Sequence, residues 1–270
     1  MQLTREKINY LLFLYEHQET NYTITKMAQH IGVSKSTLSR VLNTFYQDGL
    51  VLEKGKGKLS CLGCKQARQY KKEIQKITNW LMNTADFKQE EAYQEALTLI
   101  LSLSHQGKLK LVNHTNIARL FELIENIKYI NGDMLSANLD DGQYPFAFTV
   151  YKEDGIGISM ANDGFVHPAL LNVCLGRGEL LLTVKEVEHE SLMGKMVLKG
   201  KLSSLKYQID GQYQEAELLH DNYIIPISQL HFYYSKDERI LQTAFKIRVQ
   251  ANVGLIHMPE SEAIITIIIK

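Results

Sequence analysis

Hydrophobic residues recur at helical spacing in three short segments near the start of the chain. Within each segment the apolar positions are three or four residues apart, which places them on one face of a helix. The pattern therefore predicts three amphipathic helices that bury these faces together. The apolar positions are Ile8, Leu11, Leu12 and Tyr15 in the first helix (about 5–17), Ile24, Met27, Ala28 and Ile31 in the second, and Leu38, Val41, Leu42 and Phe45 in the third.

Residues that start and stop helices separate these segments. Gly32 ends the second helix and allows a tight turn, because glycine tolerates a positive φ. Ser34 is a favourable N-cap for the third helix, and Gly49 follows its end. Apolar residues at 51–52 and 59 then flank the segment EKGKGK. This order predicts a helix-turn-helix followed by a short basic β-hairpin, which is a winged helix.

The outward face of the third helix carries short hydrogen-bonding side chains and cations. Such a face supplies donors and acceptors for base edges and positive charge for phosphates. A helix pair that merely packs would also have a polar outer face, but it would not account for the order of helix, turn, capped helix and basic hairpin. We therefore predict DNA contacts from Lys35, Ser36, Thr37, Ser39, Arg40 and Asn43 in the helix, and from Lys54, Lys56 and Lys58 in the wing.

The net charge of zero hides an asymmetric distribution. Residues 1–75 contain 12 Lys/Arg and 6 Asp/Glu, a net charge of +6, whereas the remaining residues contain 18 and 24, a net charge of −6. Phosphate contacts supply most of the sequence-independent affinity for DNA, so a DNA-reading domain concentrates basic charge. The neutral total argues against a protein that coats nucleic acid along its whole length.

Residues 65–131 are predicted to form a helical dimerisation region after a DNA-binding domain at 1–64. A helix at about 65–82 repeats apolar residues every 3.5 positions, which is typical of a helix that packs along another. A second helix, at about 88–105, is apolar nearly all round and needs cover on every side, in part from a partner subunit. A third is expected at about 116–130. A homodimer suits two reading helices that must span one turn of DNA.

From residue 132 to the end the sequence predicts a β-rich domain for an effector or for assembly. Four Asp-Gly pairs mark turns, at 141–142, 154–155, 163–164 and 210–211. The clearest hairpin is LKYQI-DG-QYQEA. The number and spacing of the strands indicate a sandwich or a barrel, so the whole chain is expected to have an α+β fold. The other expected strands are FAFTVY, GELLLTVKEV, GKMVLKGKL, NYIIPI, AFKIRVQ and AIITIII.

The overall composition is ordinary for a globular protein, with 45% hydrophobic and 22% charged residues among 270. The first ten residues do not form a secretory pattern, and no apolar run approaches the roughly 20 residues that span a bilayer. Three cysteines provide no disulfide framework. We therefore expect a cytoplasmic protein that does not insert into a membrane.

The first ~130 residues resemble the metal-dependent repressors of the diphtheria-toxin-repressor and manganese-regulator family. The similarity runs through INYLLFLY, MAQHIGVSKSTLSRVL, DGLV and the short wing KGKGKLSCLGCKQA. The multiple-antibiotic-resistance type of winged helix shares some of these motifs but usually has a longer wing. The resemblance implies a dimeric, winged-helix transcriptional repressor with two dimerisation helices after the wing.

The family's metal ligands are missing from this chain. The resemblance places ligand positions at Asn9, Leu12, Ile74, Ile100 and Leu101, and a divalent metal needs His, carboxylate or thiolate ligands. We therefore expect no metal and no other cofactor at this junction. Apolar packing should instead hold the first helix against the dimerisation helices.

Other candidate sites have plain structural alternatives. Cys61 and Cys64 form a CxxC that is either a redox or metal switch or a pair of small residues at a strand-to-helix junction. A thioredoxin-like role would need a βαβ context. The scattered histidines His167, His189, His220 and His231 are better explained as surface or core residues than as ligands of a metal or haem in the β domain.

Two further features also have a simple structural explanation. The segment Gly176-Arg177-Gly178 is better read as a turn than as an anion cradle, and aromatic residues such as those at 232–234 suit strands as well as a pocket.

The sequence thus predicts a sequence-specific regulator of transcription that binds double-stranded DNA and is controlled by its C-terminal domain. A small-molecule effector or partner would change the placement of the two reading helices. Two alternatives remain open: a metal-dependent repressor with ligands from the C-terminal domain, and an enzyme with an accessory helix-turn-helix. No nucleophile elbow, Walker loop or dinucleotide-binding glycine pattern supports the enzyme.

Overall fold

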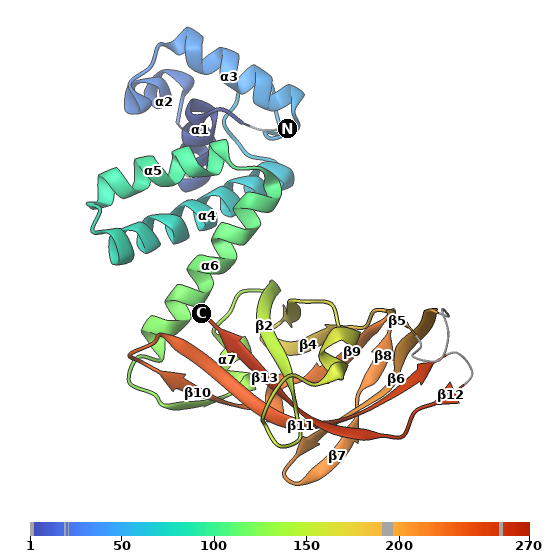
Figure 1. Ribbon diagram of the computed structural model, residues 1–270. Helices are drawn as coiled ribbons and strands as arrows, with labels where there is room; N and C mark the ends of the chain where they lie inside the picture. Colours follow the sequence, from blue (N-terminus) through green and yellow to red (C-terminus); the bar gives the residue numbers. More distant parts are fainter. Residues whose placement is uncertain (1–2, 19, 21, 191–196, 254–255) are drawn as a thin grey trace. The chain divides into compact units, whose positions relative to one another are not determined.

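A computed structural model describes the chain except for residues 1–2, 19, 21, 191–196 and 254–255. The chain divides into two compact units, Met1–Thr115 and Asn116–Lys270. The first unit is helical, and the second is built mainly from antiparallel strands (Figure 1). The α+β class predicted from the hydrophobic pattern is confirmed.

The first unit packs its helices around one apolar core. Thr23 caps α2, and the side chains of Leu38, Leu42 and Phe45 in α3 are completely buried. The same core extends to α4 and α5, so the three short helices and the two that follow them share a single cluster of buried side chains. The helices are α1 (Arg5–Glu16), α2 (Ile24–Ile31), α3 (Lys35–Gln47), α4 (Cys61–Ala85) and α5 (Gln89–Ser102).

Helix α4 begins at Cys61, four residues before the expected start. The Ser60 hydroxyl accepts a hydrogen bond from the Gly63 amide at 3.0 Å and caps the helix. Gly63 lies so close to the Leu50 carbonyl that a Cβ atom would stand 2.0 Å from that oxygen. The two cysteines therefore lie in the first turn of a helix, and the glycine between them permits the close backbone approach.

Helix α6 (His105–Leu123) begins well before the expected third helix. The Ser104 hydroxyl accepts from the Gly107 amide at 3.1 Å, which provides a cap that the weak apolar pattern of 105–115 does not reveal. The boundary between the two units falls within α6. Ile117, Leu120 and Ile124 belong to the core of the second unit. In the contact pattern, the end of the segment predicted for dimerisation thus belongs with the β-rich part of the chain.

The intrachain core also covers much of α5. Ala92, Ala96, Leu97 and Ile100 are buried within the chain, and Leu99 is half-buried. The apolar residues that suggested cover by a partner subunit therefore already find most of their contacts inside one chain.

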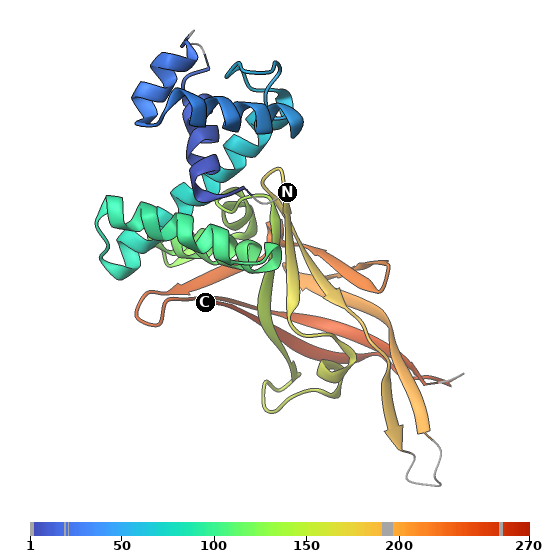
Figure 2. The same cartoon turned by 90° about the horizontal axis from the view of Figure 1, so that it is seen from above.

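The second unit consists of antiparallel strands that fold into two layers around one core. Strand β2 joins the layers: residues 147–152 pair with β13, and residues 142–146 pair with β3. The path of pairings runs from β1 to β8 without closing on itself in the described residues, so the unit is an open sandwich. Figure 2 shows the long strands β6, β11 and β13 side by side.

The elements of the second unit follow in chain order. They are β1 (Tyr129–Asn131), α7 (Gly132–Ala137), β2 (Gly142–Lys152), η1 (Met160–Gly164), β3 (Ala169–Cys174), β4 (Arg177–Thr183), β5 (Val187–Glu190), β6 (Val197–Ile209), β7 (Gln212–Glu215), β8 (Glu217–Leu219), β9 (Asn222–Pro226), η2 (Ile227–Gln229), β10 (His231–Ser235), β11 (Ile240–Val253), β12 (Ile256–His257) and β13 (Ser261–Ile269).

The clearest predicted hairpin is present. Asp210 and Gly211 have φ values of 48° and 80° and connect β6 to β7, as expected for an Asp-Gly turn whose two central residues have positive φ. One strand is missing from the expected set: the residues after His167 contain β3, which pairs with β2 and β4. The Asp-Gly pair at 163–164 lies in η1 rather than in a hairpin turn. The first residues of GKMVLKGKL, 194–196, lie outside the described part.

Among the described residues, no helix is both long enough and apolar enough to span a bilayer.

Candidate DNA-reading surface

The turn between α2 and α3 has the geometry that the sequence predicts. Gly32 has a φ of 75°, and the Val33 amide donates to the Ala28 carbonyl at 2.9 Å. Ser34 then caps α3, because its hydroxyl accepts from the Thr37 amide at 3.1 Å. These hydrogen bonds satisfy backbone groups at both helix ends and fix the direction in which α3 leaves the turn.

The outer face of α3 is polar and carries unpaired positive charge. Lys35, Ser36 and Arg40 are exposed, whereas Thr37, Ser39 and Asn43 are half-buried. Neither Lys35 nor Arg40 forms an ion pair with a described residue, so both cations are available to an external anion. Helix α3 thus keeps its apolar side in the core and its two cations in solvent.

Two of the predicted contact residues also take part in the helix cap. The Ser34 hydroxyl lies 2.9 Å from the Ser36 hydroxyl and 2.8 Å from the Thr37 hydroxyl. A base or phosphate contact by Ser36 or Thr37 would compete with this hydrogen-bonded cluster. Arg40, Ser39 and Asn43 lie beyond the cap.

The wing is a narrow hairpin closed by one bridge between Val51 and Leu59. The Leu52 amide donates to the Lys58 carbonyl at 2.9 Å. Gly57 packs so tightly that a Cβ atom would lie 2.7 Å from Leu14, so the hairpin rests against the helices at this point. Lys54, Lys56 and Lys58 are all exposed, although Lys56 forms an ion pair with Glu53 at 2.6 Å.

An aromatic cluster that the sequence did not predict lies in the same unit. The rings of Phe13 and His17 stack at 4.3 Å, and the ring of His30 lies 5.8 Å from that of His17. Tyr22 completes the cluster at 6.0 Å from His30. It connects the end of α1 to α2. Apolar spacing could not reveal this cluster, because two of its members are histidines, and His17 and Tyr22 lie outside the helices.

The other candidate residues have ordinary structural surroundings. Cys61 is exposed, and the Cys64 thiol lies 3.4 Å from the Gln18 side-chain oxygen. His167 stacks on Phe148 at 4.2 Å, and its Nε2 lies 3.2 Å from the Asn162 carbonyl. The side chain of His189 lies outside the described residues. Within the described part of the chain, no group of three or more His, Cys, Asp or Glu side chains could hold a metal ion.

Three positions that the family resemblance assigns to metal ligands do come together. Asn9, Leu12 and Ile74 line one pocket between α1, α4 and α5, but Ile100 and Leu101 do not. Leu12 and Ile74 are also part of the core, as expected if apolar packing joins these helices. The pocket itself, of about 580 Å³, was not expected.

The second unit contains an apolar pocket of about 320 Å³ between η1, β6 and the β11–β13 region. Met160 and Met258 both line it and are 76% and 46% exposed. Ile156 and Ile158, in the loop before η1, are 77% and 60% exposed. Contiguous patches of exposed apolar side chains are typical of interaction sites, so this pocket is a candidate site for an apolar ligand. No local sequence pattern indicates this pocket, because its lining residues come from five separated segments, 160–164, 187, 200–202, 249–251 and 258–261.

One comparison with known proteins falls on the helices that carry the candidate DNA-reading surface. Residues 3–53 match the MarR family, which covers α1 to α3 and the start of the wing. No curated protein matches the chain. The family match supports a helix-turn-helix transcriptional regulator as the class of protein. The matched family is the multiple-antibiotic-resistance type, whose winged helix shares some motifs with this chain.

Several solved structures show remote similarity. The manganese regulator SloR is 15% identical over 84% of this chain and 100% of that chain, with a TM-score of 0.35. IdeR from T. acidophilum is 14% identical over 80% and 93%, with a TM-score of 0.34. The NEAT5 domain of IsdX2, a B. anthracis hemophore in complex with heme, is 21% identical over 47% and 96%, with a TM-score of 0.31. All three scores are below 0.5, so these similarities do not define the site.

Proposed function

We propose that this protein is a transcriptional regulator that reads double-stranded DNA with α3 and holds the phosphate backbone with its wing. The observation that carries this proposal is the capped helix α3, which buries Leu38, Leu42 and Phe45 and presents Arg40 and Lys35 to solvent. A helix of this kind fits the major groove, where a cation can contact guanine or phosphate. We further infer that the first ~130 residues are related to the diphtheria-toxin-repressor type of regulator, from the order of helices and the short wing.

DNA selection followed by binding measurements tests the proposal. A preferred sequence is first selected from random duplexes, and affinity for it is compared with affinity for a scrambled duplex. Arg40→Ala should weaken binding to the selected duplex by about 1–3 kcal/mol and reduce the preference over the scrambled one. Lys110→Ala, which removes an exposed cation from α6, serves as the control. Equal binding by wild type and Arg40→Ala would reject α3 as the reading helix.

Dimerisation through 65–131 remains part of the proposal. Its support is the need for two reading helices on a two-fold operator, together with the half-exposed leucines Leu99 and Leu101 on α5. Light scattering at micromolar concentration measures the oligomeric state directly, and a monomer in both free and DNA-bound forms would exclude it.

Control through the C-terminal unit is supported by its apolar pocket. We infer that an apolar small molecule binds there, with Met160 and Met258 at the opening, and that its binding changes operator affinity. A long-chain alcohol and naphthalene are uncharged, mainly apolar probes of different shape. Met160→Lys places a charge at the opening without disturbing the core, so it should abolish binding of whichever probe binds. Binding that is unaffected by Met160→Lys, or that leaves operator affinity unchanged, would contradict control at this pocket.

A further inference from the structure

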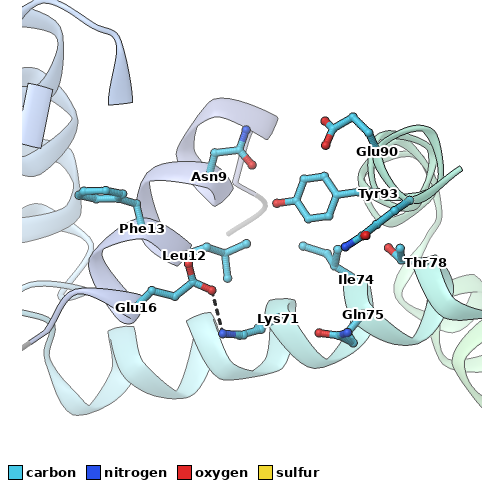
Figure 3. Close-up of a pocket in the computed structure, with 11 residues that line it drawn as sticks. Asn9, Leu12, Phe13, Glu16, Lys71, Ile74, Gln75, Thr78, Glu90 and Tyr93 are labelled. Atoms are coloured by element: carbon cyan, nitrogen blue, oxygen red, sulfur yellow. Dashed lines mark hydrogen bonds and ion pairs between the residues drawn. The ribbon is translucent and has the colours of Figure 1, made fainter. Parts of the chain in front are cut away.

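The pocket between α1, α4 and α5 has a buried apolar floor and a polar rim (Figure 3). Leu12 and Ile74 are 8% and 2% exposed and form the floor, whereas Asn9, Glu16 and Glu90 are exposed. All three helices belong to the same compact unit. A volume of about 580 Å³ lies within the range of about 300–1,000 Å³ that is usual for small-molecule sites.

The charged groups of this pocket favour a cation. Lys71 is already paired with Glu16, since its Nζ lies 2.7 Å from the Glu16 Oε1. Glu90 accepts a hydrogen bond from the Gln94 side-chain amide at 2.8 Å, and no described cation pairs with it. Counted over its lining residues alone, the pocket has two carboxylates and one ammonium group, a net charge of −1. The Arg5 guanidinium lies outside the lining and donates to the Gln94 side-chain oxygen.

Tyr93 lies between the Glu16 and Glu90 carboxylates, and their charges affect the pKa of its hydroxyl. Burial raises the pKa of its hydroxyl, the negative charges of Glu16 and Glu90 raise that pKa further, and the positive charge of Arg5 lowers it. Figure 3 shows the Tyr93 ring reaching across the pocket from α5, with its hydroxyl directed toward α1. A positively charged group beside this hydroxyl would interact favourably with both carboxylates.

One buried polar atom in the pocket lacks a partner. Thr78 is 8% exposed, and its hydroxyl forms no hydrogen bond with a described residue. A threonine within a helix ordinarily bonds back to the carbonyl one turn earlier, but this one does not. Buried polar groups without partners are rare because they lose their hydration without compensation. This oxygen is closed to solvent, so a polar group of a ligand would reach it after the Thr78 side chain turns toward the pocket.

We propose that this pocket binds a small organic cation with an apolar body, with the amine near Glu90 and Tyr93 and the body against Leu12 and Ile74. An organic anion would face two carboxylates. A bare divalent metal would find only those two carboxylates among the lining groups of its preferred types, with one of them held by Lys71. The proposal concerns binding alone and does not depend on the DNA-binding function.

Three probes that share a phenyl ring and differ in their polar group test the proposal on the full-length protein. They are 2-phenylethylamine, 2-phenylethanol and phenylacetate. Isothermal titration should show the amine binding more tightly than the alcohol, with no binding of the carboxylate. Glu90→Gln should weaken the amine by about tenfold and leave the alcohol unchanged, because it removes a charged hydrogen-bonding partner. Glu95→Gln, an identical change at an exposed position of α5, should leave both affinities unchanged.

A second variant examines the pocket floor. Thr78→Val removes the unpartnered hydroxyl while it preserves the shape of the side chain, and should leave the melting temperature unchanged or higher. It should weaken a probe that carries a hydroxyl next to the amine, 2-amino-1-phenylethanol, more than 2-phenylethylamine.

Four outcomes would overturn the proposal. Three concern the organic probes: no heat with the amine, tighter binding of phenylacetate than of the amine, or equal amine affinity in wild type and Glu90→Gln. The fourth is that the amine does not bind, whereas manganese binds and Glu90→Gln abolishes the manganese binding. These results would leave the DNA-binding proposal standing, because none of the measurements contains DNA.

Discussion

The Lys56 ammonium lies 2.6 Å from the Glu53 carboxylate at the tip of the wing. Both side chains are more than half exposed, so the ion pair contributes little to folding. It does, however, place a negative charge among the three lysines that are proposed to contact phosphate. The wing therefore presents less positive charge to DNA than its lysines alone would give.

We expect Glu53→Gln to strengthen DNA binding. The substitution removes a repulsive carboxylate and frees Lys56, so affinity should rise several-fold for selected and scrambled duplexes alike. The slope of log affinity against log salt should become steeper by about one phosphate contact. Lys56→Ala should have the opposite effect on both quantities. Fluorescence anisotropy at salt concentrations between about 50 and 200 mM measures both quantities.

The matched control is Glu95→Gln, which makes the same charge change on α5. Affinity and salt slope that shift equally in the two variants would show that only the net charge of the protein matters. The wing would then have no specific role.

Gly63→Ala should destabilise the first unit. A Cβ at this position would lie 2.0 Å from the Leu50 carbonyl oxygen, so the start of α4 must move away from the wing strand. Overpacking of this kind costs about 1–3 kcal/mol, more than the small gain in helix propensity from alanine. Urea denaturation followed by the helical circular dichroism signal measures the loss.

Lys65→Ala changes an exposed residue two positions further along the same helix and should leave stability nearly unchanged. If Gly63→Ala is as stable as Lys65→Ala, the close approach of α4 to Leu50 is not required by the fold.

Tyr223→Phe should maintain or increase stability at neutral pH. Tyr223 is 1% exposed, and its hydroxyl has no hydrogen-bond partner among the described residues, so removing it relieves an unsatisfied buried group. Such groups cost about 1–3 kcal/mol. Tyr129→Phe, which removes a hydroxyl from an exposed tyrosine of the same unit, is the control and should have little effect.

The stability of Tyr223→Phe should also depend less on alkaline pH than that of wild type. Burial, with a smaller effect of Glu215, raises the pKa of Tyr223 from 10.0 to about 12. Above pH 10 the unfolded chain ionises at this tyrosine while the folded chain keeps the proton, so stability falls as pH rises toward 12. Tyr223→Phe should lose less stability than wild type between pH 9 and pH 11, both within about one unit of the ordinary tyrosine pKa. Parallel pH curves for the two proteins would contradict the burial of this hydroxyl.

DNA binding should not depend on manganese or iron held by the helices of the first unit. Asn9, Leu12 and Ile74 line the pocket where the family resemblance places metal ligands, and none of the three supplies a carboxylate, imidazole or thiolate. Operator affinity should therefore be the same with chelator and with added divalent metal. A large effect of chelator, with metal located between α1 and α4, would show that this expectation is wrong. Metal found only in the second unit would instead favour a repressor with C-terminal ligands.

The sequence alone was sufficient to predict features that depend on residues close together along the chain. The helical spacing of apolar side chains, Gly32 in its turn, Ser34 at its cap and the Asp-Gly turn at 210–211 each act within a few residues. The predicted helix-turn-helix, the basic wing and an α+β fold followed from these local signals. So did the outward position of Arg40, because buried neighbours at Leu38 and Leu42 fix which face of α3 meets solvent.

Tertiary structure decided the features that join distant segments. The early start of α4 depends on the contact between Gly63 and Leu50, and the pairing of β3 with β2 cannot be read from either strand alone. The ion pair between Glu16 and Lys71 and the unpartnered hydroxyl of Thr78 define a pocket from residues on separate helices. Pattern analysis detects which face of an element is apolar, but not which other element covers it. Cavities and charge pairs form only when those faces meet, so they were visible in the folded chain alone.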